Sequence, residues 1–563
     1  MSSHDVFEYI VDGTSGLVPG DVSGKALIAG VCSKGTAGKI YYLGKSSDLN
    51  GLLGAGPLVD RLNDIFTVCG QSATVLAVPV PGSPAGYIGA VEHIGEGPEI
   101  EIHGLAAINA DVVISVTDGG APGVAKVKIS NDGGENFDAA TVVPENGQIT
   151  INDTGVTIVL EFGDLIKDDS YSFVVRSAIG PVEQIGHGPQ ITAAGTVTMA
   201  AQILMQVVKS GGRNKGQYKI STDGGDNYGP YRTIPIDGLI SVGDTGVSIS
   251  FPEGEYTFGT EYCFDLMAPV PTITSVIESL ALPLESIDPE FVHICGPSDS
   301  IDWTALGSLA DDLFNKHRPT IFTCESRLPN AAEDLNDFTT AMKIERRSVS
   351  ARFVAVCTAF GETTNRTGES VLRNAGGLLA GRILSIPVQR DIGRVRDQGI
   401  TPLKLPEGYA ESMQSELETA GFITATTYAG LSGVYWGDAR TLADATSDYQ
   451  YLEVLRVTFK AIRLLRIQAL KSLKDEAGDP ILGLDASGLS YLKANLENAL
   501  DTMTKAKPKE MAAYVVNIPD GQDIVNNGVA VEVTLIGIPI IKSIKLYASY
   551  VYAGSSFDPR LSA

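Results

Sequence analysis

The middle of the chain repeats itself at a fixed spacing, and this repeat limits the possible folds more than any other feature. Helical periodicity is missing between about Val91 and Pro271, where Gly, Asp, Thr and alternating Val and Ile dominate. Each later segment lies 91 residues after an earlier counterpart: Gly95–Pro98 and Gly186–Pro189, Lys128–Phe137 and Lys219–Tyr228, Pro144 and Pro235, Asp153–Val156 and Asp244–Val247, Tyr171–Phe173 and Tyr262–Phe264. One spacing across five pairs indicates a tandem duplication. We therefore predict two all-β sandwich modules, at 92–183 and 184–270.

Each repeat contains an acidic, glycine-rich turn. The two turns read Asp-Gly-Gly-Glu-Asn-Phe from Asp132 and Asp-Gly-Gly-Asp-Asn-Tyr from Asp223, each with a serine two residues ahead. Clustered oxygen atoms suggest a calcium loop, but the twelve-residue spacing and closing Glu of an EF-hand are missing. The pattern Ser-x-Asp-x-Gly followed by an aromatic residue favours an Asp-box turn, in which the Asp side chain caps main-chain donors.

The repeats interrupt an α/β pattern. Strands are expected at Lys25–Cys32 and Thr74–Pro79 with a helix between them at 56–68, and strand–helix alternation resumes after Pro271. The simplest account is insertion of both β modules into one α/β domain. The predicted fold class is a multidomain α+β or α/β protein, divided into an N-terminal arm (1–20), a discontinuous α/β domain (21–91 plus 271–392), the two modules, a C-terminal core domain (393–538) and a C-terminal arm (539–563).

Composition excludes several classes of function. The chain of 563 residues has a net charge of −25, which argues against nucleic acid as its principal partner. It has no apolar run of 18 residues and no signal-peptide pattern, so neither membrane insertion nor secretion is expected. The six cysteines are scattered, with no CxxC pair, as expected for buried reduced thiols.

No catalytic or cofactor motif is present. The stretch Gly38–Ser46 resembles a P-loop, but five residues separate its glycines where the motif has four, and two tyrosines stand where the main chain must curl around phosphate. HExxH, GxSxG and metal-binding histidine spacings do not occur. We predict that the chain is not an enzyme and binds neither metal nor cofactor.

Both ends of the chain carry strand-like segments. At the N-terminus such a segment spans Val6–Val11, followed by glycine- and proline-bearing residues 12–20. Near the C-terminus, alternation predicts an apolar hairpin that needs further strands against it, because an isolated hairpin is marginal in water. Terminal strands joined to the body by flexible linkers suggest that neighbouring subunits pair these strands with one another. The residues expected to exchange between subunits are Val6, Phe7, Tyr9, Ile10, Val529, Val531, Val533, Leu535, Ile541, Ile544, Leu546 and Tyr550.

The longest expected helix, Asp448–Lys474, is basic in an acidic chain. Apolar residues from Leu452 to Leu473 form a stripe along it, and basic residues decorate its other sides: Arg456, Lys460, Arg463, Arg466, Lys471 and Lys474. Three interpretations remain open: a solvated amphipathic face, docking on an acidic protein surface, or nucleic-acid binding. Residues 92–275 hold 9 basic and 24 acidic residues, so the β modules are a strongly acidic, solvated part of the chain.

Three stretches resemble the tail sheath proteins of contractile bacteriophages and related injection machines. They are the N-terminal block KALIAGVCSKGTAGKIYYLGKSSDLNGLLGAGPLVDRLNDIFTVCGQSATVLAVPV, the helix SDYQYLEVLRVTFKAIRLLRIQAL and the ending VAVEVTLIGIPIIKSIKLYASYV, which together cover about half of the chain. The likeness lies in the order of these elements along the chain and in their residue patterns. The 91-residue duplication lies outside the part that resembles this family.

The resemblance implies a structural subunit that polymerises helically around an inner tail tube. By this likeness, terminal strands pass between neighbouring subunits, and contraction drives the tube through the host envelope during genome delivery. The implied partners are other copies of the chain, the tail tube protein, and baseplate and tail terminator proteins, with direct nucleic-acid contact and membrane insertion not expected. The implied location is the virion, after assembly in the bacterial host cytoplasm. The helix Asp448–Lys474 becomes the candidate for the tube contact. The alternative function is a β-rich surface adhesin or carbohydrate-binding protein, with the duplicated modules as its working part.

Overall fold

The structure is a computed structural model that describes residues 24–69, 75–89, 91–104, 106–160, 163–330, 333–364, 368, 370–479, 487–557 and 559–561. The chain divides into two compact units, Met1–Ile467 and Gln468–Ala563. Each unit has its own sheets and is described separately.

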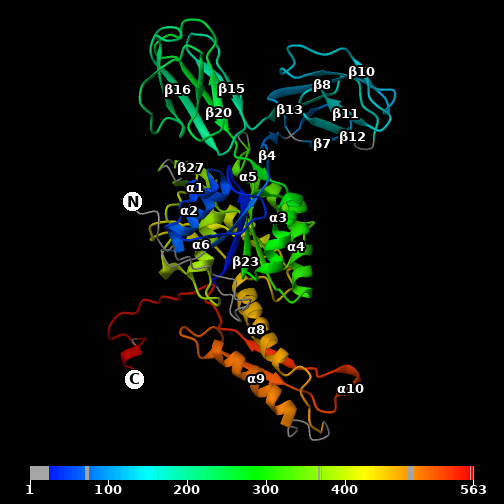
Figure 1. Cartoon of the computed structure of the whole chain (residues 1–563), viewed down its shortest axis with the longest axis vertical. Coiled ribbons are helices and arrows are strands. Elements are labelled where there is room, and N and C mark those ends of the chain that lie inside the picture. The colour runs from blue at the N-terminus through cyan, green and yellow to red at the C-terminus, as the bar shows by residue number, and fades with distance from the viewer. Residues whose placement is uncertain are drawn as a thin grey trace, which may run out of the picture. The chain divides into compact units, whose positions relative to one another are not determined.

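A six-stranded sheet organises the first unit (Figure 1). Its order is β2-β3-β1-β23-β24-β25, and all neighbours are parallel except β2, which runs antiparallel to β3. Counted along the chain without β2, the parallel strands follow the order 2-1-3-4-5, one of the doubly wound arrangements. The strands are β1 (Ala26–Val31), β2 (Tyr41–Leu43), β3 (Val75–Val80), β23 (Phe291–Ser298), β24 (Ile321–Ser326) and β25 (Val354–Cys357). Their nearly continuous apolar sequences fit a parallel sheet covered on both faces.

Helices cover both faces of this sheet. α2 (Pro57–Cys69) and α6 (Gly376–Ser385) lie together on one side, and α3 (Ile273–Ser286) and α4 (Ser300–Asn315) lie on the other (Figure 1). α6 approaches α2 closely because Gly381 has no side chain: a Cβ there would lie 2.9 Å from Cβ of Val68. The remaining helices of this unit are α1 (Leu49–Leu53), α5 (Leu335–Arg346), α7 (Glu411–Thr419) and most of α8 (Leu452–Lys471).

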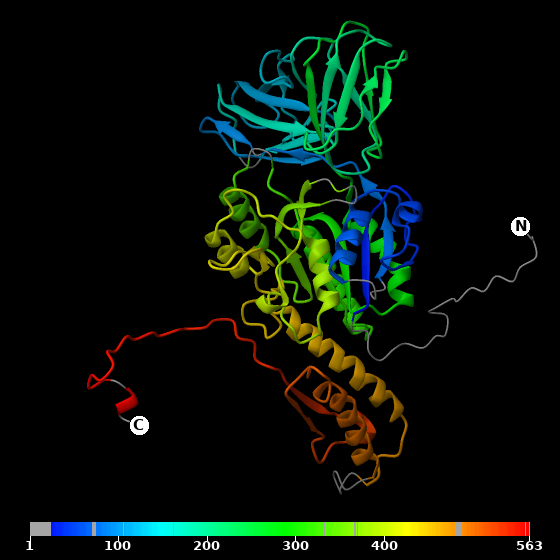
Figure 2. The same ribbon diagram turned by 90° about the vertical axis from the view of Figure 1, so that its left-hand side faces the viewer.

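The repeated region forms two matching sets of antiparallel sheets (Figure 2). The central strands β8 (Ala110–Asp118) and β16 (Ala201–Lys209) share the same alternation of buried and exposed residues. The first set comprises β5 (Tyr87–Ile88), β6 (Glu92–Ile94), β7 (Ile100–Gly104), β8, β9 (Lys126–Ser130), β10 (Thr141–Val142), β11 (Gln148–Ile151), β12 (Val156–Leu160) and β13 (Ser170–Arg176). The second comprises β14 (Glu183–Ile185), β15 (Thr192–Gly195), β16, β17 (Gln217–Ser221), β18 (Arg232–Thr233), β19 (Leu239–Ser241), β20 (Val247–Ser250) and β21 (Glu261–Leu266). Each set encloses its own apolar core.

The two acidic turns have the geometry of the Asp-box prediction. The Asp132 carboxylate accepts hydrogen bonds from the Ser130 hydroxyl at 2.6 Å and from the main-chain and side-chain nitrogens of Asn136 at 2.9 and 2.7 Å. Asp223 repeats these bonds with Ser221 and Asn227. The carboxylates thus cap their own turns, which confirms the prediction of a structural turn.

A short two-stranded ribbon joins the repeated region to the α/β sheet. β4 (Gly82–Ser83) pairs with β22 (Val270–Pro271), so the chain leaves and returns side by side. The ribbon lies against two neighbouring strands of the large sheet: a Cβ on Gly82 would lie 2.5 Å from the Val31 side chain, and one on Gly296 would lie 3.0 Å from Pro271. Val31 and Gly296 belong to the carboxyl ends of β1 and β23.

The first unit extends beyond the domain boundary predicted at 393. Phe422, Ile423 and Leu442 belong to the same apolar core as the large sheet, and the Ile423 amide donates to the Val356 carbonyl at 2.9 Å. The compact units divide instead between 467 and 468, within α8. This correction follows from packing: the segment has no core of its own. Its strands are β28 (Ala425–Thr426) and β29 (Tyr435–Trp436), and the hairpin β26 (Phe360–Thr364) with β27 (Ser370–Asn374) precedes it.

A buried ionic network ties α2 to the sheet. Nε and Nη2 of Arg61 each donate to one Glu325 oxygen at 2.6 Å, and His293 Nε2 lies 3.3 Å from the same carboxylate. Burial alone would raise the pKa of Glu325, but the charge and hydrogen bonds of Arg61, with His293, outweigh burial and lower this pKa to about 2. Arg373 of β27 forms a further buried ion pair with Asp64 of α2.

Replacement of Glu325 by Gln is expected to destabilise the first unit at pH 7 by about 3–5 kcal/mol, because it leaves Arg61 buried without its counter-charge. The pKa of Glu325 is lowered from 4.5 to about 2, so its ionised form contributes stability above pH 4.5 that is lost as the pH falls toward 2. The difference between wild type and E325Q in denaturant midpoint, followed by tryptophan fluorescence, should therefore shrink across that interval. The control E362Q removes the exposed pair with Lys404 and should change stability by less than about 1 kcal/mol. An equal effect of both variants would contradict the assignment.

Candidate assembly interface

The second unit is built around a two-stranded sheet. β30 (Ala513–Asn517) pairs antiparallel with β31 (Glu532–Ile536), and α9 (Ser487–Thr504) lies against β30. The Tyr514 hydroxyl donates to the Asp501 carboxylate at 2.7 Å and to the Glu497 carbonyl at 3.0 Å, which fixes the strand on the helix. Among the described residues each strand is paired on one edge only, so the sheet has two free edges.

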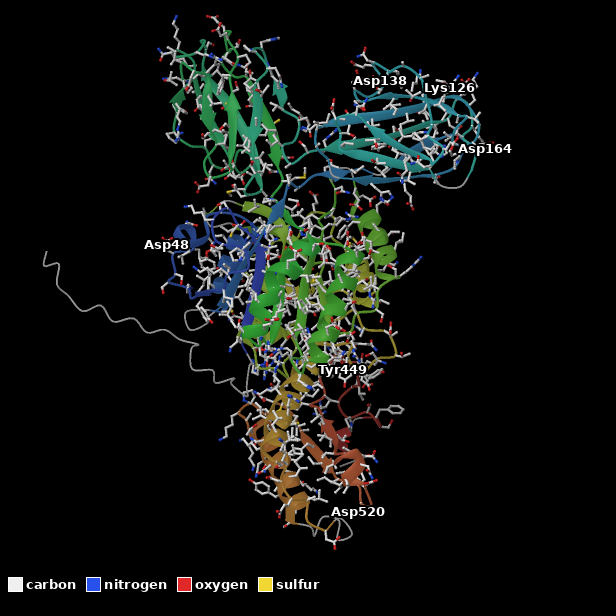
Figure 3. The ribbon with its side chains drawn as sticks, turned by 45° about the vertical axis from the view of Figure 1, so that its right-hand side comes forward. Asp48, Lys126, Asp138, Asp164, Tyr449 and Asp520 are labelled. Carbon is white, nitrogen blue, oxygen red and sulfur yellow. The ribbon has the colours of Figure 1, made fainter. Side chains whose placement is uncertain are left out.

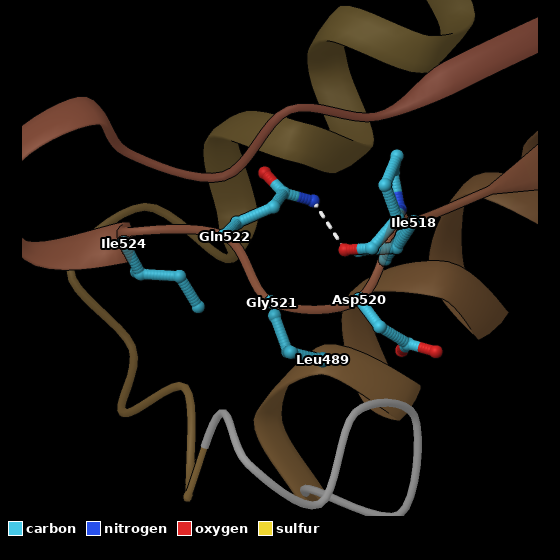
Figure 4. A pocket seen from close by; sticks show the side chains of 7 residues that line it. Leu489, Ile518, Asp520, Gly521, Gln522 and Ile524 are labelled. Atoms are coloured by element: carbon cyan, nitrogen blue, oxygen red, sulfur yellow. Dashed lines mark hydrogen bonds between the residues drawn. The ribbon is translucent and has the colours of Figure 1, made fainter.

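The loop between these strands is held by one side chain (Figure 4). Gln522 Nε2 donates to the carbonyls of Pro519, at 2.8 Å, and Ala530, at 3.0 Å, and its Oε1 accepts from the Ala530 amide at 2.6 Å. The short helix α10 (Ile524–Asn527) lies within this loop. Because Ala530 bonds to Gln522, the predicted continuous strand from Val529 is interrupted, and β31 begins only at Glu532. Val529 and Val531 thus precede the strand, whereas Val533 and Leu535 lie within it.

Beyond β31 the chain runs as an arm, defined here as residues 537–557. Hydrogen-bonded strand pairing is missing throughout this described segment. Its large apolar side chains are open to solvent, with exposed fractions of 73–91 % for Ile541, Ile544, Leu546, Tyr547, Tyr550 and Tyr552. Ile544, Leu546, Tyr550 and Tyr552 occupy even positions and would share one face of an extended strand. The arm therefore combines a strand-forming sequence with no strand pairing among the described residues.

The predicted N-terminal exchange residues Val6, Phe7, Tyr9 and Ile10 lie outside the described residues.

The structure corrects the predicted partner-facing set on α8 at two positions. Arg456 and Arg463 are buried, with exposed fractions of 3 % and 6 %. Arg456 Nε donates to Glu290 at 2.5 Å, and its Nη2 donates to the Ile383 carbonyl at 3.1 Å. Arg463 donates to both Asp288 oxygens, at 3.0 and 2.9 Å. These arginines hold α8 to the α/β body, and their charges are buried in ion pairs with Glu290 and Asp288.

The other three basic residues differ in exposure. Lys460 is half-buried, whereas Arg466 and Lys471 are exposed near the end of the helix. The sequence periodicity of α8 could have predicted which of its basic residues are buried and which are exposed. Leu452, Arg456, Phe459 and Arg463 follow the spacing i, i+4, i+7, i+11 and thus share one helical face, so the two arginines belong with the apolar stripe.

Among the residues that the structure describes, a ribbon occupies the place where a sheet of this kind usually binds small molecules. Doubly wound sheets bind ligands outside the carboxyl ends of the strands, where the strand order reverses. Here the reversal lies between β1 and β23, and the β4–β22 ribbon packs on the ends of both strands. The P-loop-like stretch forms β2 instead of a phosphate-binding turn before a helix. In the described part of the chain, groups of three or more His, Cys, Asp or Glu side chains placed to hold a metal are missing, and none of the described helices is long and apolar enough to cross a membrane.

Two family models together match most of the chain. The model described as DUF2586, N-terminal domain, matches residues 3–440, and the model described as DUF2586, C-terminal domain, matches 448–555. The chain belongs to the DUF2586 family. No curated protein sequence matches this DUF2586 chain.

Among solved structures, the DUF2586 chain is similar to sheath proteins. A sheath tail protein of Desulfitobacterium hafniense has 12 % identity and a TM-score of 0.41, over 95 % of this chain and 100 % of that one. A sheath tail protein of Listeria innocua has 11 % identity and a TM-score of 0.39, over 92 % and 96 %. The contracted sheath complex of PVC, an extracellular contractile injection system, has 17 % identity and a TM-score of 0.37, over 52 % of this chain and 76 % of that one.

Substitution of Arg463 by Ala is expected to lower the free energy of unfolding of the first unit by about 3–5 kcal/mol, because Asp288 and two main-chain carbonyls lose a buried partner. The matched variant R466A removes an exposed arginine one turn along α8 and should change stability by less than about 0.5 kcal/mol. Urea unfolding followed by tryptophan fluorescence distinguishes them. Similar stabilities of R463A and wild type would show that this ion pair does not anchor the helix.

Proposed function

We propose that this chain is the subunit of a contractile tail sheath, which assembles helically around an inner tube by pairing terminal strands between copies. The observation that carries the proposal is the exposed arm at 537–557, which leads directly out of a sheet with two free edges. The three stretches that resemble sheath proteins point to the same function.

The donor and acceptor roles follow from the second unit alone. The β30–β31 sheet is the acceptor, because its outer edges carry main-chain N–H and C=O groups free to pair. The arm is the donor, because its even-numbered apolar face has nothing to cover it. The N-terminal segment Val6–Val11 is proposed as a second donor, so that two donor arms serve the two free edges.

Pairing between different surfaces of identical subunits extends without closing, and with a rotation at each step it produces a helical tube. Extended residues span about 3.3 Å each, so the arm reaches about 70 Å. An arm of this length lets subunits move apart and rotate while their strands stay paired. Contraction would then be a change between two packings of the same subunits, driving the tube through the host envelope.

Arg466 and Lys471 are the proposed contacts with the tube protein. Both are exposed at the end of α8, unlike the two buried arginines. Exposed charges of this kind set the rate and specificity of docking more than its affinity. Baseplate and terminator proteins are proposed as further partners, in a virion tail assembled in the bacterial cytoplasm.

The repeated β units are proposed to be a duplicated insertion that forms the outer surface of the sheath. Residues 92–183 contain 16 acidic and 4 basic residues, and residues 184–270 contain 8 acidic and 5 basic residues. Asp138 and Asp164 are two exposed acidic residues of the first β repeat (Figure 3). A strongly charged surface stays hydrated and resists association.

Truncation after Gly537 should leave a folded subunit that forms no tubes, because the donor strand is lost while every described core stays intact. Negative-stain electron microscopy of the purified chain and the truncated chain, mixed with the tube protein as template, tests this expectation. Tubes of normal length from the truncated chain would contradict the proposal.

Proline at Leu546 should abolish tube formation, because it removes one main-chain donor and fixes φ in the paired strand. Alanine at the same position keeps the donor and should only weaken assembly, since it removes one of several apolar contacts. Both variants should match wild type in thermal unfolding, because Leu546 is 89 % exposed in the isolated chain. Equal assembly of L546P and L546A would show that this residue is not within an exchanged strand.

A further inference from the structure

Three arginines converge on one carboxylate in the first unit. Asp397, in the 3₁₀ turn Val395–Asp397, has a carboxylate oxygen 3.2 Å from Arg390 Nη1, 3.4 Å from Arg394 Nη1 and 3.7 Å from Arg382 Nη2. Residues 382–399 hold four arginines and two aspartates, in a chain whose net charge is −25. Two carboxylates, Asp391 and Asp397, cannot neutralise four guanidinium groups, so this segment has positive charge in excess.

A cavity of about 210 Å³ adjoins this cluster. α2 and α6 supply part of its wall, residues 397–401 supply another part, and Trp436 of β29 also lines it. Its polar and aromatic lining residues include Thr67, Arg382, Ser385, Asp397, Thr401 and Trp436. This volume accommodates a small polyatomic ion with water, since one water occupies about 30 Å³ in the liquid.

Arg382 is the member of the cluster that reaches the cavity wall with an unmet donor. Its Nε donates to the Ile392 carbonyl at 3.0 Å, but its buried Nη2 makes no hydrogen bond with protein atoms. Burial lowers the pKa of Arg382, and the neighbouring charges of Arg390 and Arg394 act in the same direction, against those of Asp397 and Asp391. A buried cationic donor without a full set of partners is costly, and an anion in the cavity would supply one.

We propose that this cavity is a binding site for an oxyanion, a phosphate or carboxylate group held by Arg382, while Arg390 and Arg394 neutralise the Asp397 carboxylate in its wall. The arginine excess disfavours a cation, and the polar wall disfavours an apolar ligand. Guanidinium groups match the planar geometry of carboxylates and the oxygen pairs of phosphate. The oxyanion is either free in solution or the Asp or Glu side chain of another protein, and the same donors serve both.

The cavity contains a natural reporter. The chain has two tryptophans, of which Trp303 is fully buried in the core and Trp436 lines the cavity. Titration of the full chain with sodium phosphate should give a saturable fluorescence change with Kd of about 1 mM or tighter, whereas sodium chloride at the same ionic strength should not. W436F should lose the fluorescence change and keep the heat of phosphate binding in calorimetry.

Two variants separate the site from general electrostatics. R394Q should weaken phosphate binding about tenfold, because it removes a positive charge that pairs with Asp397 and leaves this lining carboxylate to repel the anion. R396Q removes an exposed arginine of the same turn and should bind like wild type. Circular dichroism checks that both are folded. Equal weakening by both variants would overturn the proposal.

A parallel titration with sodium acetate distinguishes the two sources of the anion. Tighter binding of phosphate supports a free ligand, whereas saturable acetate binding that R394Q weakens, with phosphate no better, supports an acidic side chain of a neighbouring protein. If neither anion binds more tightly than chloride, the cavity holds only water and the proposal fails. Tube formation is not part of any readout, so this result is independent of the proposed sheath function.

Discussion

Main-chain hydrogen bonding at the C-terminal sheet is the constraint on which the rest of the molecule depends. A strand buries its polar groups only when both edges are paired, and the β30–β31 sheet pairs one edge of each strand. The arm that follows lacks a surface to cover its apolar face, which is open to solvent. This hairpin alone leaves both the strand edges and the apolar face uncovered, and both would be covered if, as proposed, the arm of one copy pairs with the sheet of another.

Free-energy magnitudes indicate why such pairing would operate as a network. Burying the four large side chains on the even face of the arm yields about 6–12 kcal/mol at about 1.5–3 kcal/mol each. Fixing the nine residues from Ile544 to Tyr552 costs about 9–18 kcal/mol at about 1–2 kcal/mol each. One arm therefore gains little on its own, apart from its main-chain hydrogen bonds. In the proposed assembly, several arms joined through the same subunits would raise one another's effective concentration, so assembly would be cooperative.

The sequence was sufficient where a local period coincided with burial. The β–α–β alternation gave β1, α2 and β3 within one or two residues, because Leu58, Leu62 and Ile65 repeat at helical spacing between apolar strands. It was insufficient where long-range partners decide. Arg456 looks like a surface charge until Glu290, far away in the chain, is placed beside it. The unit boundary at 467 was equally hidden, because it depends on which core receives Phe422 and Ile423. The cavity at Asp397 has no sequence motif either, since it is formed by α2, α6 and β29 together.

The ribbon that carries the repeated β units also limits the chemistry of the α/β unit. In doubly wound proteins the crevice beside the strand reversal stays open for ligands. Here β4 and β22 pack on Val31 and Gly296, at the ends of the two strands that border this crevice. Gly296 has φ of +113°, which lets β23 bend beside the ribbon and places its amide 3.2 Å from Glu325. The same glycine thus serves the ribbon on one side and the buried ionic network on the other, so the place where doubly wound sheets usually bind ligands is taken up here by the ribbon.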